Sequence, residues 1–302
     1  MTDTPFEGVY PALTTPFDEN GRIDFEQLRA DVRRLERAGV DGVVPVGSTG
    51  ESATLTHDEH VQVIEATVET ATVPVVAGTG SNNTQEALSL SRRAADVGAD
   101  ALLLISPYYN RPEQRGLRAH YETIADGVDL PQIVYNVPSR TGQNIEADTV
   151  VTLASHPTIQ GLKAASGDLS QISEVVERTR EEEFAVLSGD DALTLPAMSV
   201  GATGTISVVA NVEPERTVAM VEAAQAGDYE EAGERHHELA PLWRALFCET
   251  NPIPVKEALH IREGNPPHLR SPLTRLTPDL REELSALLDD LSTRSVPAEA
   301  AD

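Results

Sequence analysis

The sequence predicts an α/β protein: a TIM-type (β/α)8 barrel followed by a C-terminal helical extension. Short runs of β-branched and apolar residues alternate with stretches of helical period, the alternation is even, and it stops after residue 208. Strands that alternate with helices pair in parallel through right-handed crossovers, and eight such units close a barrel. A doubly wound open sheet is the alternative, but no dinucleotide-binding fingerprint follows the first strand.

The expected strands are eight short apolar runs, at residues 9–14, 40–46, 73–78, 101–106, 132–136, 159–163, 185–188 and 204–208. The first helix, expected at residues 24–38, has Leu28, Val32 and Leu35 three to four positions apart, which is the spacing of one apolar helix face. The second, at residues 56–71, starts with Thr56 and Glu59 at the spacing of a capping box. Further helices are expected at residues 84–97, 113–127, 146–154, 169–180 and 192–200.

Only helices are expected after the eighth strand, at residues 213–226, 229–247, 254–262 and 278–291. The first of these closes the barrel. We therefore expect a barrel domain at residues 1–226 and a C-terminal helical domain with its tail at residues 227–302. The tail from Ser292 is polar and contains proline and alanine, so we expect it to fray.

The composition excludes several classes of partner. Twenty-three Lys and Arg stand against 49 Asp and Glu, a net charge of −26, which repels nucleic acid and anionic membranes. Small molecules and other copies of the chain are the expected partners. No run approaches the ~18 apolar residues that span a bilayer, so we expect a cytoplasmic protein. Cys248 is the only cysteine, which excludes an intramolecular disulfide.

The excess of acidic residues and the near replacement of lysine by arginine are typical of a halophilic protein. Dense surface carboxylates keep such a protein hydrated, while salt screens their mutual repulsion. The hypothesis predicts a melting temperature that rises from low to multimolar KCl. Only Lys163 and Lys256 remain as lysines.

Lys163 stands at the end of an apolar run in IQGLKAASG, where a solubilising charge has no purpose. Two interpretations are open. Lys163 is either a buried cation paired with a carboxylate, or a neutral amine that attacks a carbonyl. A free lysine titrates near ~10.4, and burial or a neighbouring charge lowers this value by several units.

Two further clusters follow expected strands, where a barrel places its active site. GSTGES offers glycines and the hydroxyls of Ser48 and Thr49 to a small anion, a carboxylate rather than a triphosphate; a tight turn is the alternative. YNVPSRTG carries Tyr135 and Arg140, a proton shuttle and a carboxylate ligand, or else a core tyrosine and a surface arginine.

Three other features are less specific. GTGSNN lacks the third glycine of a dinucleotide turn. Tyr108 and Tyr109 in SPYYNRP are packed aromatics or hydroxyl donors. His57 and His60 share a helix face, but no third metal ligand is evident, so we expect no metal.

The order of these motifs resembles one family. GSTGESATL, SPYYNRP, YNVPSRTG, GLKAASG, LSGDD, GTISVVANV and NPIPVK, between Gly8 and Leu291, occur as in the dihydrodipicolinate synthases. These belong to the pyruvate-dependent class I aldolases, together with N-acetylneuraminate lyases and 2-keto-3-deoxygluconate aldolases. The resemblance implies a homotetramer, a dimer of dimers, that condenses pyruvate with L-aspartate 4-semialdehyde in lysine and diaminopimelate biosynthesis, without metal or organic cofactor.

The resemblance also implies roles for single residues. Lys163 forms the Schiff base with pyruvate. Tyr135 shuttles the proton, linked through Ser48 to Tyr109 of a neighbouring subunit. The remaining implied roles are substrate binding by Thr49 for the pyruvate carboxylate and Arg140 for the semialdehyde carboxylate, with Gly189 and Ile206 lining the pocket.

A second pocket is implied at positions where bacterial members bind lysine as a feedback inhibitor: Ser52, Ala53, His57, His60, Asn82, Glu86 and Tyr108. The sequence departs from the family at three positions. Ser48 stands where many members have threonine, and Ala164 and Val209 replace a glutamate and a threonine.

Two other functions stay open. A related pyruvate aldolase that acts on a sugar acid is the nearer one, but such enzymes generally lack an arginine at the position of Arg140. A non-catalytic barrel that binds a metabolite is the other. The presence of Lys163, Tyr135 and Arg140 argues against it.

Overall fold

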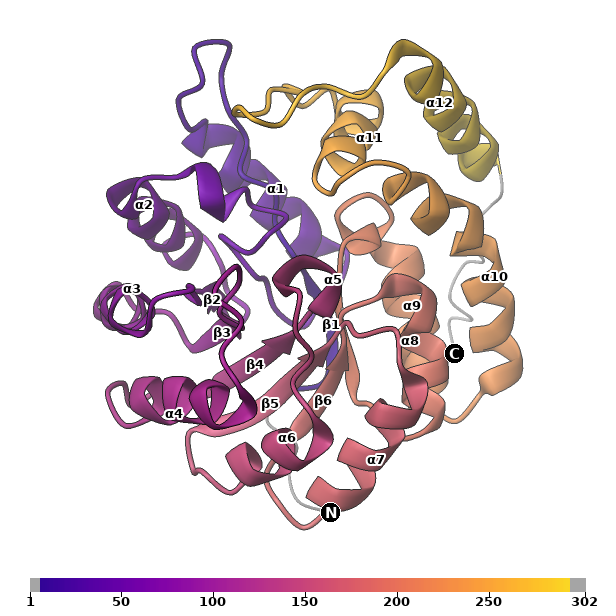
Figure 1. The fold of residues 1–302 in the computed structure, drawn as a ribbon. Coiled ribbons are helices and arrows are strands. Elements are labelled where there is room, and N and C mark those ends of the chain that lie inside the picture. The colour runs from indigo at the N-terminus through magenta and orange to yellow at the C-terminus, as the bar shows by residue number, and fades with distance from the viewer. Residues whose placement is uncertain (1–5, 294–302) are drawn as a thin grey trace.

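The structure, a computed structural model, describes residues 6–293. Its centre is a parallel sheet in the order β1-β7-β6-β5-β4-β3-β2, surrounded by helices (Figure 1). The strands are β1 (Gly8–Pro11), β2 (Val76–Gly78), β3 (Ala101–Ile105), β4 (Gln132–Asn136), β5 (Ile159–Ala164), β6 (Ala185–Ser188) and β7 (Gly204–Ser207). Seven of the eight expected runs therefore form regular strands.

The second expected strand, at residues 40–46, is reduced to single bridges. Val44 bridges to Ala12 beyond β1, and Val43 bridges to Val75 before β2. Pro45 has no N–H to donate, and Val46 leaves the extended region with φ +50°. The run is thus too short to count as a strand, yet it connects both edges of the sheet. The TIM-type barrel is confirmed, and this segment joins the two edge strands of the sheet.

The helices of the barrel begin and end within a few residues of their expected bounds. They are α1 (Phe25–Arg37), α2 (His57–Val68), α3 (Thr84–Asp96), α4 (Gln114–Ala125), α6 (Ala147–Ala154), α7 (Leu169–Thr179), α8 (Thr194–Ser199) and α9 (Pro214–Gln225). The capping box of α2 is present: Thr56 accepts from the Glu59 N–H, and the Glu59 carboxylate accepts from the Thr56 N–H. A short helix that periodicity cannot predict, α5 (Pro138–Thr141), follows β4.

The C-terminal extension consists of α10 (Tyr229–Leu246), α11 (Ile253–Glu263) and α12 (Pro278–Thr293), drawn in orange to yellow along one side of the barrel (Figure 1). Helix α10 contacts α9 and α8, and α12 contacts α10 and α11. The domain boundary at residue 226 stays a prediction. The tail was expected to fray from Ser292, but Ser292 and Thr293 belong to α12, and residues from 294 on lie outside the described part. No helix between residues 6 and 293 is long and apolar enough to cross a membrane.

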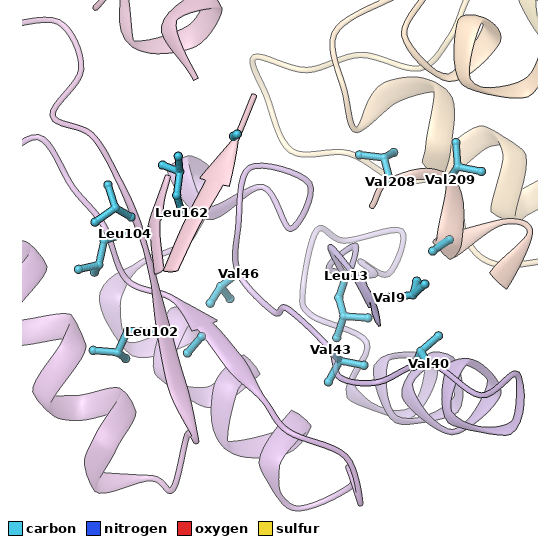
Figure 2. Close-up of a cluster of buried hydrophobic side chains, with 14 of the residues drawn as sticks. Val9, Leu13, Val40, Val43, Val46, Leu102, Leu104, Leu162, Val208 and Val209 are labelled. Carbon is cyan, nitrogen blue, oxygen red and sulfur yellow. The ribbon is translucent and has the colours of Figure 1, made fainter. Parts of the chain in front are cut away.

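The apolar side chains form two clusters on opposite faces of the sheet. The larger lies between the strands and the outer helices and includes Leu102, Leu104 and Leu162 (Figure 2). The smaller contains Ile133, Tyr135 and other side chains of the opposite face. Side chains alternate along a strand, so the neighbours of Leu162 in β5 face this second cluster. Lys163 therefore points into the barrel interior.

Candidate active site

Lys163 lies inside the barrel beside Tyr135. The two residues are directly opposite each other in the register of β4 and β5. The Lys163 side chain is buried, and its Nζ lies 4.3 Å from the centre of the Tyr135 ring. No ion pair between Lys163 and a carboxylate is found in residues 6–293, in contrast to the other lysine.

This environment favours one of the two interpretations of Lys163. Burial lowers the pKa of Lys163 to about 7, Asp191 opposes the shift, and Arg140 adds to it. At neutral pH a large fraction of the amine is therefore unprotonated. The side chain suits a nucleophile better than a structural cation.

Lys256 is the structural cation. Its Nζ pairs with the carboxylate of Glu51 and donates to the His268 carbonyl oxygen at 2.9 Å. Both side chains are buried. Burial lowers the pKa of Lys256 to about 8, and the charge and hydrogen bond of Glu51 oppose this shift. Lys256 is thus a buried cation paired with a carboxylate, which was one of the two interpretations of Lys163, whereas Lys163 itself has no such partner in residues 6–293.

Gly189 supports the Lys163 side chain from the end of β6. A Cβ atom at this position would lie 2.8 Å from Lys163 Cε and 2.9 Å from Lys163 Cγ. Only glycine leaves room for the extended lysine there. Ile206 of β7 belongs to the same inner cluster as Tyr135. Both residues lie beside the side chains of the barrel interior, but neither is among the residues that line the cavity described below, so their pocket-lining role stays a prediction.

Asp191 is a buried carboxylate near the same strand ends. It accepts hydrogen bonds from Ser207 Oγ and from the N–H groups of Val208 (3.1 Å) and Val209 (3.2 Å). Burial raises the pKa of Asp191, and these three hydrogen bonds oppose the shift. Asp191 therefore stabilises the turn after β7, and its charge raises the pKa of Lys163 against the effect of burial.

Tyr135 lies in β4, and Arg140 lies in the short helix α5 that follows it. Burial raises the pKa of Tyr135 to about 12, and the charge of Arg140 opposes the shift, so Tyr135 is a phenol at neutral pH. Arg140 is exposed at the mouth of a cavity and donates from Nη2 to the Asn251 carbonyl oxygen at 3.1 Å. Its remaining N–H groups leave it able to bind a carboxylate.

The GSTGES sequence forms a tight turn that also contributes to the cavity. Within the turn, the Gly50 N–H donates to the Gly47 carbonyl oxygen at 3.1 Å. Ser48 lies on the cavity wall. Thr49 is buried, and its hydroxyl oxygen accepts from Asn251 Nδ2 at 2.8 Å. The tight turn is confirmed, and the binding of a carboxylate by its hydroxyls stays a prediction.

One cavity of about 470 Å³ is lined by residues of both predicted sites, although Lys163 and Thr49 are not among its lining residues. Ser48, Tyr135 and Arg140 line one part of it. The other part carries six of the seven residues of the expected second pocket: Ser52, Ala53, His57, His60, Glu86 and Tyr108. The seventh, Asn82, is not on the wall; its carbonyl oxygen accepts from Asn110 Nδ2 at 3.1 Å.

The two histidines of α2 have separate partners. His60 is buried, and its Nε2 lies 2.7 Å from the Gly78 carbonyl oxygen. Burial lowers the pKa of His60 to about 4, so the ring is neutral. His57 Nε2 pairs with Glu86 Oε1 at 2.8 Å. Residues 6–293 contain no group of three or more His, Cys, Asp or Glu placed to hold a metal ion.

Tyr109 does not reach the cavity of its own chain. Its side chain is 91% exposed, and its backbone adopts φ +72°, which is uncommon for a bulky residue. No hydrogen bond joins the hydroxyls of Tyr135, Ser48 and Tyr109 within the described residues of one chain. The expected relay requires a second copy.

Comparison with known proteins agrees with this geometry. Residues 5–291 match the model of the Dihydrodipicolinate synthetase family. The chain belongs to the dihydrodipicolinate synthetase family. It is 66% identical over 303 residues to a 4-hydroxy-tetrahydrodipicolinate synthase of Haloarcula marismortui, covering 100% of this chain and 99% of that one. A 4-hydroxy-tetrahydrodipicolinate synthase of Natronomonas pharaonis is 62% identical, and the match covers 96% of this chain and 99% of that one.

Solved structures of dihydrodipicolinate synthases have the same fold. That of Aquifex aeolicus is 44% identical, with a TM-score of 0.93 and coverage of 95% of this chain and 98% of the other. That of Cyanidioschyzon merolae, with lysine bound, is 38% identical, with a TM-score of 0.92 and coverage of 96% and 99%. The halophilic type expected from the composition is consistent with the match to Haloarcula.

The family's motifs contain residues to which sequence reasoning gave no role. Asn251 and Lys256 belong to NPIPVK, and Asp191 belongs to LSGDD. Asn251 lines the cavity but belongs to the C-terminal extension. A search limited to residues that follow strands therefore misses it. Two departures from the family, Ala164 and Val209, are buried in the larger apolar cluster outside the barrel interior.

Proposed function

We propose that the chain condenses pyruvate with L-aspartate 4-semialdehyde to give 4-hydroxy-tetrahydrodipicolinate, through a Schiff base on Lys163. The observation that carries the proposal is the buried Lys163 amine, which has no carboxylate partner and a pKa lowered to about 7. Its relatives' shared name, 4-hydroxy-tetrahydrodipicolinate synthase, supports this reaction over sugar-acid cleavage.

The reaction follows from imine chemistry. The neutral Lys163 amine attacks the keto carbon of pyruvate, water leaves, and a protonated imine forms. The imine draws electrons from the methyl carbon, which loses a proton to give an enamine. The enamine carbon attacks the aldehyde, a C–C bond forms, and the aldehyde oxygen takes up a proton. The substrate's own amine then replaces Lys163 at the imine carbon and closes the ring.

The phenol of Tyr135 is the proposed proton carrier. It lies against the Lys163 amine, and its raised pKa keeps it protonated and able to donate at neutral pH. Ser48 continues the relay. Tyr109 of a neighbouring copy completes it, and the exposure of Tyr109 in one chain supports this assignment. We accordingly propose a homotetramer, a dimer of dimers.

Arg140 and Thr49 are the proposed carboxylate ligands, for the semialdehyde and pyruvate respectively. Arg140 is exposed on the cavity wall and has free N–H groups for the incoming semialdehyde, and Thr49 is buried in the adjoining turn. If the protein instead acts on a sugar acid, Arg140→Ala will leave that activity intact. Under the proposed function, Arg140→Ala is expected to abolish the condensation with aspartate semialdehyde while the Schiff base with pyruvate still forms.

We also propose L-lysine as an inhibitor that binds the part of the cavity lined by His57, Glu86 and Tyr108. Glu86 lines this part of the cavity, and its carboxylate can accept hydrogen bonds from an ammonium group of the bound lysine. The C. merolae relative with lysine bound supports the choice of ligand.

The Schiff base is tested by trapping. The protein is incubated with pyruvate in KCl, reduced with borohydride and digested, and the peptides are weighed. Because Lys163 and Lys256 are the only lysines, the two candidate peptides are easily separated. The adduct is expected on Lys163 alone and not in Lys163→Arg, since a guanidinium forms no imine. An adduct on Lys256, or none at all, would falsify the mechanism.

A further inference from the structure

Asn251 lies between the two proposed carboxylate ligands. It precedes α11 in the C-terminal extension, is 6% exposed, and lines the cavity. Its side-chain Nδ2 donates to Thr49 Oγ1 at 2.8 Å, and its backbone carbonyl oxygen accepts from Arg140 Nη2 at 3.1 Å. One residue thus contacts both the turn proposed to bind pyruvate and the guanidinium proposed to bind the semialdehyde.

The other half of the Asn251 carboxamide is unused. Its Oδ1 is buried and has no hydrogen-bond partner. Among the side-chain atoms in this condition in residues 6–293, it is the one that belongs to a residue of the cavity wall. A buried amide oxygen normally has a partner, so a missing one at a cavity points to a ligand.

The carboxylates on the same wall are already engaged. Glu51 pairs with Lys256 and accepts from the Arg270 N–H. Glu86 pairs with His57 and accepts from Ser81 Oγ. Glu86 belongs to the part of the cavity proposed for lysine, whereas Asn251, which contacts Arg140, has an Oδ1 without a hydrogen-bond partner. This oxygen suits a cationic N–H donor that enters together with a carboxylate.

We propose that Asn251 is a specificity-determining residue whose Oδ1 accepts a hydrogen bond from the α-ammonium group of the semialdehyde, while Arg140 binds the α-carboxylate. This rests on the proposed function and deepens it. An α-amino acid carries both groups on one carbon atom. Arg140 and the Asn251 carboxamide are held together by the Arg140 bond to the Asn251 backbone, so the pair can contact both groups at once.

The proposal explains why the carboxamide is preferable to a carboxylate at this position. A carboxylate beside Arg140 would compete with the substrate for the guanidinium, whereas a neutral oxygen accepts from the ammonium group without this competition. The contact with Thr49 keeps the amide in one orientation, with Nδ2 toward the turn and Oδ1 free. Asn251 then selects an aldehyde that carries an amine.

The test compares two aldehydes in Asn251→Ala. Aspartate semialdehyde is the substrate, and succinate semialdehyde, which lacks the ammonium group, is the competing probe. We expect the KM for aspartate semialdehyde to rise by roughly 10- to 100-fold, as for loss of a hydrogen bond to a charged group. The inhibition constant of succinate semialdehyde should change by less than about 3-fold, and borohydride trapping of pyruvate should be retained.

Thr250→Ala is the matched control, because Thr250 is exposed, adjacent, and on the same wall. It should leave both constants unchanged. An equal loss for both aldehydes, or loss of pyruvate trapping, would show that Asn251 only supports Arg140 or Thr49 and would overturn the proposal.

A second measurement uses the unmodified protein and does not depend on the folding of a variant. The inhibition constant of succinate semialdehyde should exceed the KM of aspartate semialdehyde by about tenfold or more. Equal or tighter binding of the aldehyde without the amine overturns the proposal, even when pyruvate trapping succeeds. Failure of trapping itself overturns the proposed function and this inference with it.

Discussion

At the residue scale, the environment separates two chemically identical side chains. Lys163 has an aromatic ring and apolar walls, and Lys256 has a carboxylate and a carbonyl oxygen. Burial acts on both in the same direction, so the difference comes from the partner. In a chain that otherwise uses arginine, each lysine occupies a buried site, and only the one without an ion pair is suited to form an imine.

The pH dependence of trapping follows from the lowered pKa of Lys163. The neutral amine is the reactive form, and burial lowers the pKa to about 7. The initial rate of adduct formation should therefore rise about tenfold per pH unit below pH 7 and level off above it. Stopped borohydride reduction at short times, from pH 5.5 to 10 in constant KCl, measures this rate. A steep rise that continues between pH 8 and 10 would show an unshifted amine.

At the element scale, the GSTGES turn is held in place by the C-terminal extension. Glu51, which ends the turn with φ +53°, pairs with Lys256 of α11 and accepts from the Arg270 N–H. Lys256 and Arg270 both lie over the ring of Phe17, at 4.2 and 4.5 Å. The hydroxyls of Ser48 and Thr49 are thus positioned by residues distant in the sequence.

We predict that Lys256→Met lowers the free energy of unfolding by about 3–5 kcal/mol, because Glu51 is left as an unpaired buried charge. The double variant Glu51→Gln, Lys256→Met should recover most of this loss. The exposed pair Arg22–Asp18 provides the control, and Arg22→Met should cost at most about 1 kcal/mol. Denaturant unfolding in KCl measures all three; equal costs for the buried and the exposed pair contradict the prediction.

At the scale of the whole molecule, one cavity serves two proposed ligands. The residues proposed to bind the substrates, Tyr135 and Arg140, and those proposed to bind lysine, His57 and Glu86, line the same cavity. A net charge of −26 favours cationic lysine in this cavity and requires positive groups such as Arg140 to attract the anionic substrates. Tyr109 extends from this molecule into the solvent, where a second copy would cover it.

We predict that millimolar L-lysine lowers the initial rate at working salt concentration, and that Glu86→Gln raises the inhibitory concentration about tenfold, because it removes a charged partner of the ammonium group. The KM values should stay unchanged. Asp58→Asn is the control on the neighbouring helix α2, since Asp58 is exposed and pairs with Arg93 outside the cavity. Equal inhibition of the Glu86→Gln variant and the unmodified protein would place lysine elsewhere.

Most of the fold could be predicted from the sequence because its signals are local. Apolar periodicity located the helices, and the Thr56 and Glu59 spacing marked the start of α2. The segment at residues 40–46 was the exception. Its composition is that of a strand, but Pro45 and the turn at Val46 limit its pairing to Val43 and Val44. The ring still closes, because one bridge to each neighbour is sufficient to join the sheet's edges.

The site could be predicted only in part. Lys163 and Tyr135 lie near the ends of two adjacent strands and Arg140 follows one of them, so their convergence at one end of the barrel is a consequence of parallel pairing. Asn251 could not be found in this way, since it reaches Thr49 from 202 positions away. Sequence periodicity carries no information about such a contact.

The amino-acid pattern alone therefore determined the alternation of elements and the direction of the Lys163 side chain, because both depend on neighbouring positions in one strand or helix. Tertiary structure decided which lysine is paired and which is left as an amine. It also joined the two predicted pockets into one cavity and brought Asn251 between Thr49 and Arg140. The physical reason is that desolvation and ion pairing depend on which distant segments exclude water from a side chain, as Glu51 and Lys256 show from 205 positions apart.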